Sequence, residues 1–404
     1  MDPRTGIPVV GMVGAGQLAR MTHQAAVALG QSLRVLATGA DEPAALVTPG
    51  VSLGEHTDLG VLRSFAAGCD VLTFDHEHVP TDHLRALVAD GVAVRPAPDA
   101  LRHAQDKLVM RRALAGLDVP VPPFREVRGV AEVMRFGADH GWPCVLKAAR
   151  GGYDGRGVWM LNTPTGAQRV VAELLEAGTP LLVEQCVPMR RELAALVARS
   201  PFGQGAAWPV VQTVQRDGIC VQVLAPAPRL HPERAGQAEE LALRVADALG
   251  VVGVLAVELF ETAHGLLVNE LAMRPHNSGH WTIEGTVTSQ FEQHLRAVLD
   301  YPLGSTTPRA PVSVMANVLG ADTAPLMALD ERLHHLLARH PAAKVHLYGK
   351  AERPRRKIGH VTVLGDRLDP VRQIATAAAR FLATGVWEDG REVHGDSAGR
   401  RDHG

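Results

Sequence analysis

The chain has 404 residues, of which 46% are hydrophobic and 21% charged, and its formal net charge is −2. No apolar run reaches the ~20 residues that a membrane-spanning helix needs, and the near-neutral charge offers no general attraction to nucleic acid or to an anionic membrane. These properties argue against membrane proteins and nucleic-acid binders, and the length predicts a globular protein of roughly two or three domains.

The cysteines and the N-terminus indicate the compartment. Cys69, Cys144, Cys186 and Cys220 are scattered and form no CxxC pair, which argues against a zinc site and against a disulfide framework. The N-terminal stretch MDPRTGIPVVGMVGAG carries an acid and prolines where a signal peptide would have basic residues and a long apolar segment. We therefore expect buried, reduced thiols and a cytoplasmic location.

Residues 1–105 alternate strand-like and helix-like segments. The expected elements are a strand at 8–14, a helix at 17–30, a strand at 33–39, a helix at 58–67, a strand at 70–79, a helix at 81–90 and a short strand-like run at 92–96. Such alternation is typical of βαβ units, in which helices join parallel strands. This part is predicted to be a Rossmann-like domain with a parallel sheet.

A glycine-rich turn follows the first expected strand, where a dinucleotide-binding fold has its phosphate loop. Gly11, Gly14 and Gly16 have the spacing G-x-x-G-x-G and not G-x-G-x-x-G, and Asp41 lies late for the acid that binds a ribose. Two interpretations stay open: a nicotinamide dinucleotide site, or a helix N-terminus that serves another phosphate.

Residues 106–303 have a different pattern. A single helix is expected at 103–117, before a proline cluster at 118–123 that indicates a connection between domains. The further expected elements are a helix at 129–140, strands at 142–149 and 158–161, a helix at 164–177, a strand at 180–187, a helix at 237–250, and strands at 253–260 and 265–272. The result is a second, larger domain.

The remaining sequence predicts a third, smaller unit. Residues 304–311 resemble a second linker, and 304–388 are predicted to form a small β-rich C-terminal domain that ends in a helix at 369–384. Residues 389–404 contain almost no apolar side chains, which predicts a disordered tail.

Two acids mark the expected hairpin at 253–272. If its turn centres on His264, Glu258 and Glu270 face each other on the same side of the sheet, with Cβ atoms ~5 Å apart. Two opposed carboxylates repel unless a cation lies between them, and Mg²⁺ accepts one or two carboxylates together with phosphate oxygens and water. The alternative is that each glutamate pairs with an arginine as a structural ion pair.

A second motif, RGGYDGRG, lies between two expected strands. Gly151, Gly152, Gly155 and Gly157 let backbone amides approach a phosphate closely, and Lys147 on the preceding strand alternates with Val145, so it can point towards a nucleotide. The loop lacks the Walker A pattern G-x-x-x-x-G-K-[ST]. A plain mobile hairpin is the alternative.

A basic cluster, Lys350, Arg355, Arg356 and Lys357, follows a strand-like segment in a chain that is otherwise near neutral. A small phosphate group is the favoured partner, with a solvated surface or a nucleic-acid patch as alternatives.

The order of these motifs resembles the ATP-grasp superfamily. Several stretches are similar to the N5-carboxyaminoimidazole ribonucleotide synthetase family of purine biosynthesis: GMVGAGQLARM at 11–21, TFDHEHV at 73–79, GGYDGRG at 151–157, EQCVPMRREL at 184–193, NELAMRPHNSGHWT at 269–282 and KVHLYGKAERPRRKIGHVTV at 344–363. The resemblance covers nearly the whole chain, to about residue 364. It implies an ATP-grasp domain at 106–303 with a lid at about 125–183, a pre-ATP-grasp domain before it and a homodimer.

The resemblance also implies roles for individual residues. The residues expected to hold ATP are Lys107, Lys147, Gly152, Tyr153, Asp154, Gly155, Arg156, Gly157, Val158, Glu184, Gln185, Cys186, Val187, Glu192, Gln215, Asn269 and Glu270. Those expected to hold aminoimidazole ribonucleotide are Glu77, Tyr153, Asp154, Arg156, Arg274, Lys350, Arg356 and Lys357. Glu258 and Glu270 would bind Mg²⁺, with Mn²⁺ as a substitute. The expected catalytic residues are Arg274, His276, Asn277 and Lys350.

The chain departs from the family at a few positions. Asp75 and His76 stand where the family usually has Glu and Phe, which shifts the weight to Glu77 for substrate contact. Met273 replaces a proline, Val158 a glutamine, and Arg355 a glycine in the phosphate-binding turn.

The implied reaction is ATP-dependent carboxylation of the aminoimidazole amine by bicarbonate, through carboxyphosphate. Bicarbonate is a poor electrophile and must be activated, and the site must exclude water because carboxyphosphate hydrolyses. Other ATP-grasp enzymes, such as a formate-dependent glycinamide ribonucleotide transformylase or a biotin carboxylase, remain alternatives. A nucleotide-binding regulator without catalysis and a nicotinamide oxidoreductase are further ones.

Overall fold

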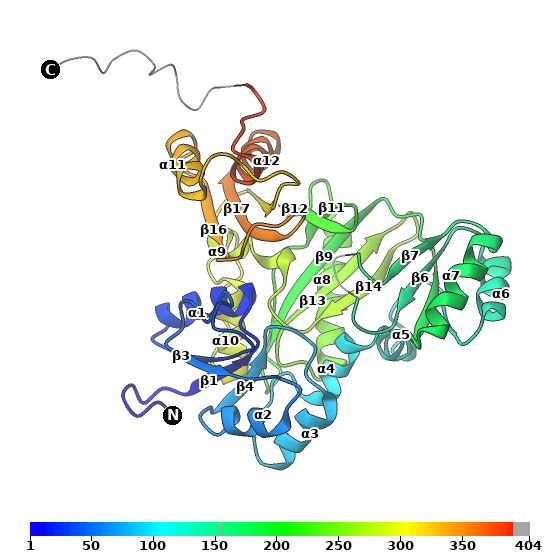
Figure 1. Cartoon of the computed structure of the whole chain (residues 1–404), viewed down its shortest axis with the longest axis horizontal. Coiled ribbons are helices and arrows are strands. Elements are labelled where there is room, and N and C mark those ends of the chain that lie inside the picture. The colour runs from blue at the N-terminus through cyan, green and yellow to red at the C-terminus, as the bar shows by residue number, and fades with distance from the viewer. Residues whose placement is uncertain (153–154, 391–404) are drawn as a thin grey trace.

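A computed structural model describes residues 1–152 and 155–390 of the chain. Its strands form three sheets. The N-terminal part and the part predicted to be a lid lie beside a large central sheet, which continues into the C-terminal part (Figure 1). Tyr153 and Asp154, which were predicted to bind ATP and substrate, lie outside the described residues, as does most of the predicted tail.

The N-terminal part is built on a parallel sheet in the order β3-β2-β1-β4. Its elements are β1 (Val9–Val13), α1 (Gln17–Ala28), β2 (Ser32–Ala37), β3 (Gly50–Leu53), α2 (Leu59–Ala66), β4 (Val71–Phe74) and α3 (Thr81–Ala89). All residues of β1 and β4 are buried, as expected for parallel strands covered on both faces. This confirms the predicted parallel sheet. Strand β3 was not expected, and of the run at 92–96 only an isolated bridge between Leu72 and Val94 is found.

The helix expected at 103–117 is instead two helices, α4 (Pro98–Gln105) and α5 (Lys107–Gly116). Asp106 separates them in an extended conformation, with φ −136° and ψ 113°. Its carboxylate accepts hydrogen bonds from the amides of Leu108 at 2.9 Å and Val109 at 3.1 Å, so it caps α5. The apolar period continues across the break, which is why the pattern alone indicated one helix.

The segment predicted to form a lid, which we continue to call the lid, has its own sheet in the order β5-β8-β6-β7. Its elements are β5 (Phe124–Val127), α6 (Val130–His140), β6 (Cys144–Ala148), β7 (Val158–Leu161), α7 (Pro164–Glu176) and β8 (Leu181–Gln185). Helices α6 and α7 pack on one another and against this sheet (Figure 1). Antiparallel β6 and β7 flank the glycine-rich loop, as predicted.

The central sheet has the order β14-β13-β9-β11-β12-β15-β17-β16, with β10 paired to β9. Its first part and the adjacent helices are β9 (Arg191–Arg199), β10 (Gly205–Ala207), β11 (Val211–Arg216), β12 (Ile219–Ala225), α8 (Pro232–Ala248), β13 (Gly253–Glu261), β14 (Leu266–Ala272), the 3₁₀ turn η1 (Asn277–Gly279), α9 (Thr282–Gly285) and α10 (Gln290–Leu299). Buried aliphatic residues of β9, β13 and β14 pack with α8 in the largest core cluster.

The C-terminal part adds β15 (Val312–Leu319), α11 (Leu329–Arg339), β16 (Lys344–Leu347), β17 (Lys357–Gly365) and α12 (Leu368–Thr384). Strand β15 pairs with β12, so the C-terminal strands continue the central sheet. Strand β15 and helix α11 were not expected. All four cysteines are free thiols, with Cys144 buried and the others partly buried. Over residues 1–152 and 155–390, no helix has both the length and the apolar character to cross a membrane.

Candidate active site

The two glutamates of the β13–β14 hairpin face each other. In the antiparallel ladder Glu258 pairs with Glu270, while the next pair towards the turn is Leu259 with Val268. Asn269 is therefore the extra residue of a β-bulge on β14. The predicted pairing is confirmed, but it depends on this bulge, which alternation of side chains could not reveal.

The bulge brings Asn269 to the same side as the acids. Its Oδ1 lies 3.1 Å from Lys147 Nζ, and its Nδ2 lies 3.5 Å from Glu258 Oε2. In a regular strand, neighbouring residues point to opposite faces of the sheet. The irregularity thus presents an amide and two carboxylates together.

The charges around the two acids are unequal. Glu270 forms an ion pair with Lys107, the first residue of α5. Glu258 Oε1 lies 3.4 Å from His276 Nε2, but burial, Arg274 and Lys357 lower the pKa of His276 to about 3, so this imidazole is neutral. Burial, followed by the charges of Glu270 and Glu192, raises the pKa of Glu258 well above its ordinary value. Positive charge is thus closer to Glu270 than to Glu258.

These donors fit a magnesium ion. The two carboxylates are hard oxygen ligands, and the raised pKa of Glu258 indicates that a cation would stabilise its ionised form. Within the described residues, no group of three or more His, Cys, Asp or Glu side chains is arranged to hold a metal. A metal here would need further ligands from a bound phosphate and water, which is the usual arrangement for Mg²⁺.

A buried ion triad stands beside the acids. Glu184 of β8 accepts from Arg111 Nε at 2.5 Å through one oxygen and pairs with Lys147 Nζ at 2.6 Å through the other. Although burial opposes it, the charges of Lys147 and Arg111 lower the pKa of Glu184 to about 2. Both carboxylate oxygens are thus engaged. Because the Glu184 side chain is engaged in this way, the predicted contact of residues 184–187 with adenine would have to come from backbone groups.

Arg111 is a site residue that the sequence analysis missed. Its side chain is fully buried, and Nη1 also donates to the carbonyl of Val268 at 3.1 Å. It therefore joins α5 to β8 of the lid and to β14 beside the acids. Lys147 is only 8% exposed, and burial lowers its pKa while Glu184 raises it.

The glycine-rich loop rests on the β11–β12 turn. Gly155 and Gly157 have φ values of +77° and +73°, which favour glycine. A Cβ atom on Gly155 would lie 3.2 Å from the Cα of Gly218, so the two backbones are in close contact. Gly152 and Val158 flank the loop in the described part of the chain.

The predicted hinge and ribose residues follow β8. The amide of Gln185 donates to the carbonyl of Pro123 at 3.0 Å, which fixes the segment against the proline cluster. Cys186 and Val187 continue it towards β9, where Glu192 is hydrogen-bonded to Gln215 of β11. Burial raises the pKa of Glu192, while Gln215 and Lys147 oppose this shift.

A second group of charges lies beyond the acids. Arg274 Nε pairs with Glu77 Oε1 at 2.8 Å. Asp75, which follows β4 directly, is close enough to act electrostatically on Arg274. Asp75 accepts a hydrogen bond from the amide of Gly16 at the start of α1. The amide that would donate to a dinucleotide phosphate is therefore already bonded to a carboxylate, which argues against the nicotinamide interpretation.

Lys350 completes this group from the C-terminal part. Its Nζ donates to Gln17 Oε1 at 2.6 Å, and its charge acts on Asp75. The charges of Glu77, Asp75 and Glu270 raise the pKa of Arg274 in spite of its burial. The structure thus brings Glu77, Arg274 and Lys350 to one region, next to the acid pair.

His276 and Asn277 have different surroundings. The amide of Ser278 donates to His276 Nδ1 at 3.4 Å, and the Ser278 hydroxyl lies 2.9 Å from the same nitrogen. If Nδ1 accepts from both groups, the proton of the neutral ring is on Nε2, towards Glu258. Asn277 forms a reciprocal pair with Asn317 of β15, with N···O distances of 3.0 and 2.8 Å. This pairing gives Asn277 a structural link to the C-terminal part, and its catalytic role stays a prediction.

The basic turn between β16 and β17 has an unusual backbone. Arg355 has φ +64°, in the left-handed region that favours glycine. Its Nη2 donates to the carbonyl of Asp217 at 3.1 Å, in the turn that supports Gly155. Arg356 donates to the carbonyl of Ala351 at 3.3 Å, and Lys357 acts electrostatically on Glu258 and His276.

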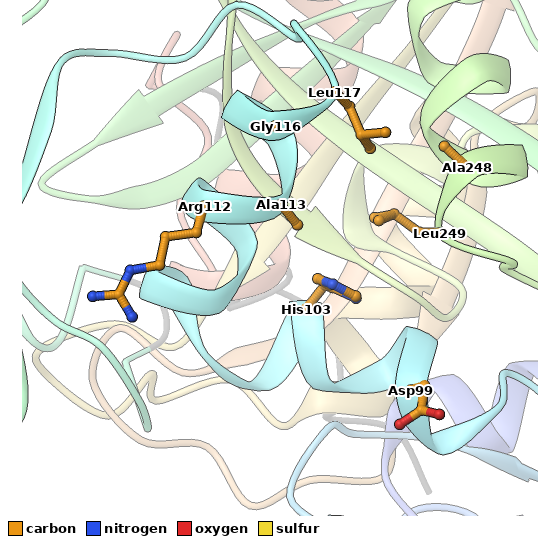
Figure 2. A pocket seen from close by; sticks show the side chains of 8 residues that line it. All are labelled: Asp99, His103, Arg112, Ala113, Gly116, Leu117, Ala248 and Leu249. Carbon is orange, nitrogen blue, oxygen red and sulfur yellow. The ribbon is translucent and has the colours of Figure 1, made fainter.

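A separate surface hollow of about 480 Å³ lies between α4, α5 and the end of α8 (Figure 2). None of the predicted site residues lines it. Its charged members are already paired, Asp99 with Arg85 and Arg112 with Glu126. It shares no residue with the acid pair or with the group around Arg274.

Comparison with known protein families matches three consecutive parts of the chain. They are a ribonucleotide synthetase preATP-grasp domain at residues 7–105, an ATP-grasp domain at 112–291 and a phosphoribosylaminoimidazole carboxylase C-terminal domain at 313–374.

Named relatives cover nearly the whole chain. The N5-carboxyaminoimidazole ribonucleotide synthase of Mycobacterium tuberculosis is 64% identical over 388 residues, which is 96% of this chain and 90% of the relative. The protein of the same name from Corynebacterium ammoniagenes is 48% identical over 394 residues, or 95% of this chain and 94% of the relative.

Solved structures agree. Carboxyaminoimidazole ribonucleotide synthase from Aspergillus clavatus, complexed with ATP, superposes with a TM-score of 0.85 at 33% identity over 93% of this chain and 98% of that one. The synthase from the same species in complex with ADP and 5-aminoimidazole ribonucleotide gives 0.84 at 33% identity, with the same coverage. The Thermus thermophilus synthetase gives 0.81 at 38% identity, also over 93% and 98%.

Proposed function

The chain belongs to the N5-carboxyaminoimidazole ribonucleotide synthase family, and from this membership we propose that it carboxylates 5-aminoimidazole ribonucleotide with bicarbonate and ATP. The products are N5-carboxyaminoimidazole ribonucleotide, ADP and phosphate. Its fold is the ATP-grasp fold, with the predicted parallel-sheet domain before it and the family's C-terminal domain after it. It is therefore a ligase of purine biosynthesis.

One observation carries the proposal: the acid pair Glu258 and Glu270 adjoins the positively charged Arg274. The acids Glu258 and Glu270 stand beside Lys107 and Lys147, and His276 links Glu258 to the region of Arg274. A metal-bound triphosphate at the acids would therefore lie next to an anion held by Arg274. Transfer of a phosphoryl group to bicarbonate requires this neighbourhood.

The nucleotide end is proposed to use the residues implied by the resemblance. Lys107 and Lys147 would hold phosphate oxygens, residues 184–187 the adenine through backbone groups, and Glu192 with Gln215 the ribose. Glu258 and Glu270 would hold Mg²⁺, or Mn²⁺ in its place. The metal, when bound, neutralises charge on the phosphates during transfer.

The substrate end would bind the ribonucleotide and bicarbonate. Glu77 orients Arg274, whose raised pKa keeps it charged and able to bind bicarbonate and then carboxyphosphate. Lys350, Arg356 and Lys357 are proposed to take the 5′-phosphate. His276 has a lowered pKa, and with Nδ1 accepting from Ser278 its proton would be on Nε2, which favours a role as hydrogen-bond donor to the carboxyl group over one as a base.

The decisive experiment measures ADP formation by the purified protein. We expect turnover only when 5-aminoimidazole ribonucleotide and bicarbonate are both present with ATP and Mg²⁺. Turnover with formate and glycinamide ribonucleotide, or with biotin and bicarbonate, would contradict the proposal. Tight ATP binding without turnover would favour the alternative of a nucleotide-binding regulator without catalysis.

A homodimer and a cytoplasmic location complete the proposal. Both derive from the resemblance to the family and from the sequence. Size-exclusion chromatography with light scattering tests the homodimer, for which a mass of twice 43.1 kDa is expected.

A further inference from the structure

A buried tyrosine and histidine lie behind the proposed phosphate-binding residues. Tyr348 follows β16 directly, and His360 is on the adjacent strand β17. Both side chains are fully buried, and the Tyr348 hydroxyl lies 2.8 Å from His360 Nδ1. We call them the Tyr348–His360 pair.

The pair lies where three parts of the chain meet. Tyr348 packs with Leu18 and Met21 of α1 and with Phe291 of α10. On the other side, the His360 ring lies 5.0 Å from the ring of His280, measured between centroids. Movement of the pair would therefore disturb the N-terminal, central and C-terminal parts together.

The His360 side of this contact is itself tied to the active site. Gln290 Nε2 lies 3.0 Å from His280 Nδ1 and donates to the carbonyl of His276 at 2.8 Å. Gln290 Oε1 accepts from the amide of His276, also at 2.8 Å. The backbone of His276 is thus fixed by a glutamine that also holds His280.

The Tyr348 side leads to the basic turn. Lys350 is two residues further on, and its Nζ lies 5.7 Å from the centroid of the Tyr348 ring, within cation–π range. The amide of Tyr348 donates to the carbonyl of Ile358 at 2.9 Å, which closes the turn at its base. Gly349 has φ +72°, and a Cβ atom there would lie 3.3 Å from Arg20 Nη1, so the turn lies close to the Arg20 side chain of α1.

Two other roles for this cluster fail. Within the described residues, no group of three or more His, Cys, Asp or Glu side chains is arranged to hold a metal, here or elsewhere. A response to pH near neutrality is also unsuitable, because burial lowers the pKa of His280 and His360 well below, and raises that of Tyr348 well above, their ordinary values. A geometric role remains.

We propose that the Tyr348–His360 pair positions Lys350, and with it the basic turn, for the phosphate end of the ribonucleotide substrate. The inference rests on the proposed function, which assigns Lys350 to that substrate. The pair itself touches no reacting atom, so these are positioning residues.

The first test replaces Tyr348→Phe, which removes only the hydroxyl. We expect the KM for 5-aminoimidazole ribonucleotide to rise about 3- to 10-fold, the effect of one buried hydrogen bond, while the KM for ATP stays within about twofold. The matched control is Tyr301→Phe, a tyrosine with 37% exposure outside the site, for which both KM values should be unchanged.

The second test asks whether the effect passes through His360. Asn places an acceptor near the position of Nδ1, so His360→Asn should keep a KM for the ribonucleotide closer to that of the wild type than His360→Leu does. Tyr348→Phe combined with His360→Leu should raise this KM no more than His360→Leu alone, because both remove the same hydrogen bond.

The outcomes separate cleanly. A lowered melting temperature of Tyr348→Phe with an unchanged ribonucleotide KM would overturn the positioning role. If Tyr348→Phe fails to fold, equal ribonucleotide KM values for His360→Asn and His360→Leu would overturn it. A wild-type protein without ribonucleotide-dependent ADP formation would instead refute the proposed function.

Discussion

At the scale of single residues, Glu258 makes the stability of the nucleotide-free protein depend on pH. Burial and the charges of Glu270 and Glu192 raise its folded pKa above that of the unfolded chain, about 4.3 for a free glutamate. The stabilisation from its protonated form is complete below the unfolded pKa and is lost as pH rises through the folded pKa. We expect Glu258→Gln to become more stable relative to the wild type as pH rises towards neutrality, measured by urea unfolding. A difference independent of pH would contradict the assigned environment.

The same substitution should have the opposite effect on activity. Glu258→Gln removes one charged metal ligand, so we expect ADP formation to fall roughly 100-fold or more, the scale of losing one electrostatic contact in the transition state. Glu240→Gln, on the exposed face of α8, is the control and should keep full activity. Unchanged turnover in Glu258→Gln would show that the metal is held elsewhere.

Arg111 offers a second residue-level prediction. Arg111→Met would leave the buried Glu184 with Lys147 as its remaining cation, and breaking a buried pair costs about 3 to 5 kcal/mol. Arg112→Met is a neighbouring control, because its pair with Glu126 is exposed and worth at most about 1 kcal/mol. Denaturant unfolding compares the two, and equal losses would contradict the triad.

The two arginines also show what the sequence could not predict. Arg111 and Arg112 are adjacent in MRRALAG, and nothing in the pattern says which one turns inwards to a carboxylate on a distant strand. The facing of Glu258 and Glu270 was predicted from a turn centred on His264, but in the structure it results from the bulge, because nearer the turn Leu259 pairs with Val268. The placement of Asn269 was not predictable, because one extra residue in a strand reverses the expected face.

At the scale of elements, the start of α5 connects local structure to the nucleotide site. Asp106 caps this helix, and Lys107 beside it reaches Glu270. We expect Asp106→Ala to lower the free energy of unfolding by about 0.5 to 2 kcal/mol and to raise the KM for ATP. Asp58→Ala removes the equivalent cap of α2, far from the acids, and should cost similar stability with no change in KM. A raised KM for ATP in both variants would show that the effect comes from general destabilisation of the fold and not from the position of Lys107.

Elements with regular periodicity were predictable, and the exceptions have physical causes. The parallel strands β1, β2 and β4 and the hairpin β13–β14 were expected because their apolar runs are bounded by glycine or polar turns. The break between α4 and α5 was missed because hydrogen bonds of the Asp106 side chain compete with the helix at one residue. Strand β15 gave no clear signal, because it is buried on both faces and lacks alternation.

At the scale of the whole molecule, the central and C-terminal parts share one sheet. Residues of β12 pair with β15, from Gln222 with Ala316 to Ala225 with Ser313. A fragment ending at residue 303 would expose this edge together with buried Val223 and Leu224, so we expect it to aggregate. Size-exclusion chromatography tests this against a fragment of residues 1–390, which should elute like the full chain. A monodisperse 1–303 fragment would show that these residues fold without the C-terminal part.

The shared sheet contrasts with the lid, whose strands β5-β8-β6-β7 make no ladder with it in the described part of the chain. Rotation of the lid therefore breaks no inter-strand hydrogen bond, whereas any change in the separation of Glu258 from Lys357 must deform a continuous sheet. If the acid pair and the basic turn hold phosphoryl donor and acceptor as proposed, a rotating lid would leave the spacing between these two sites unchanged.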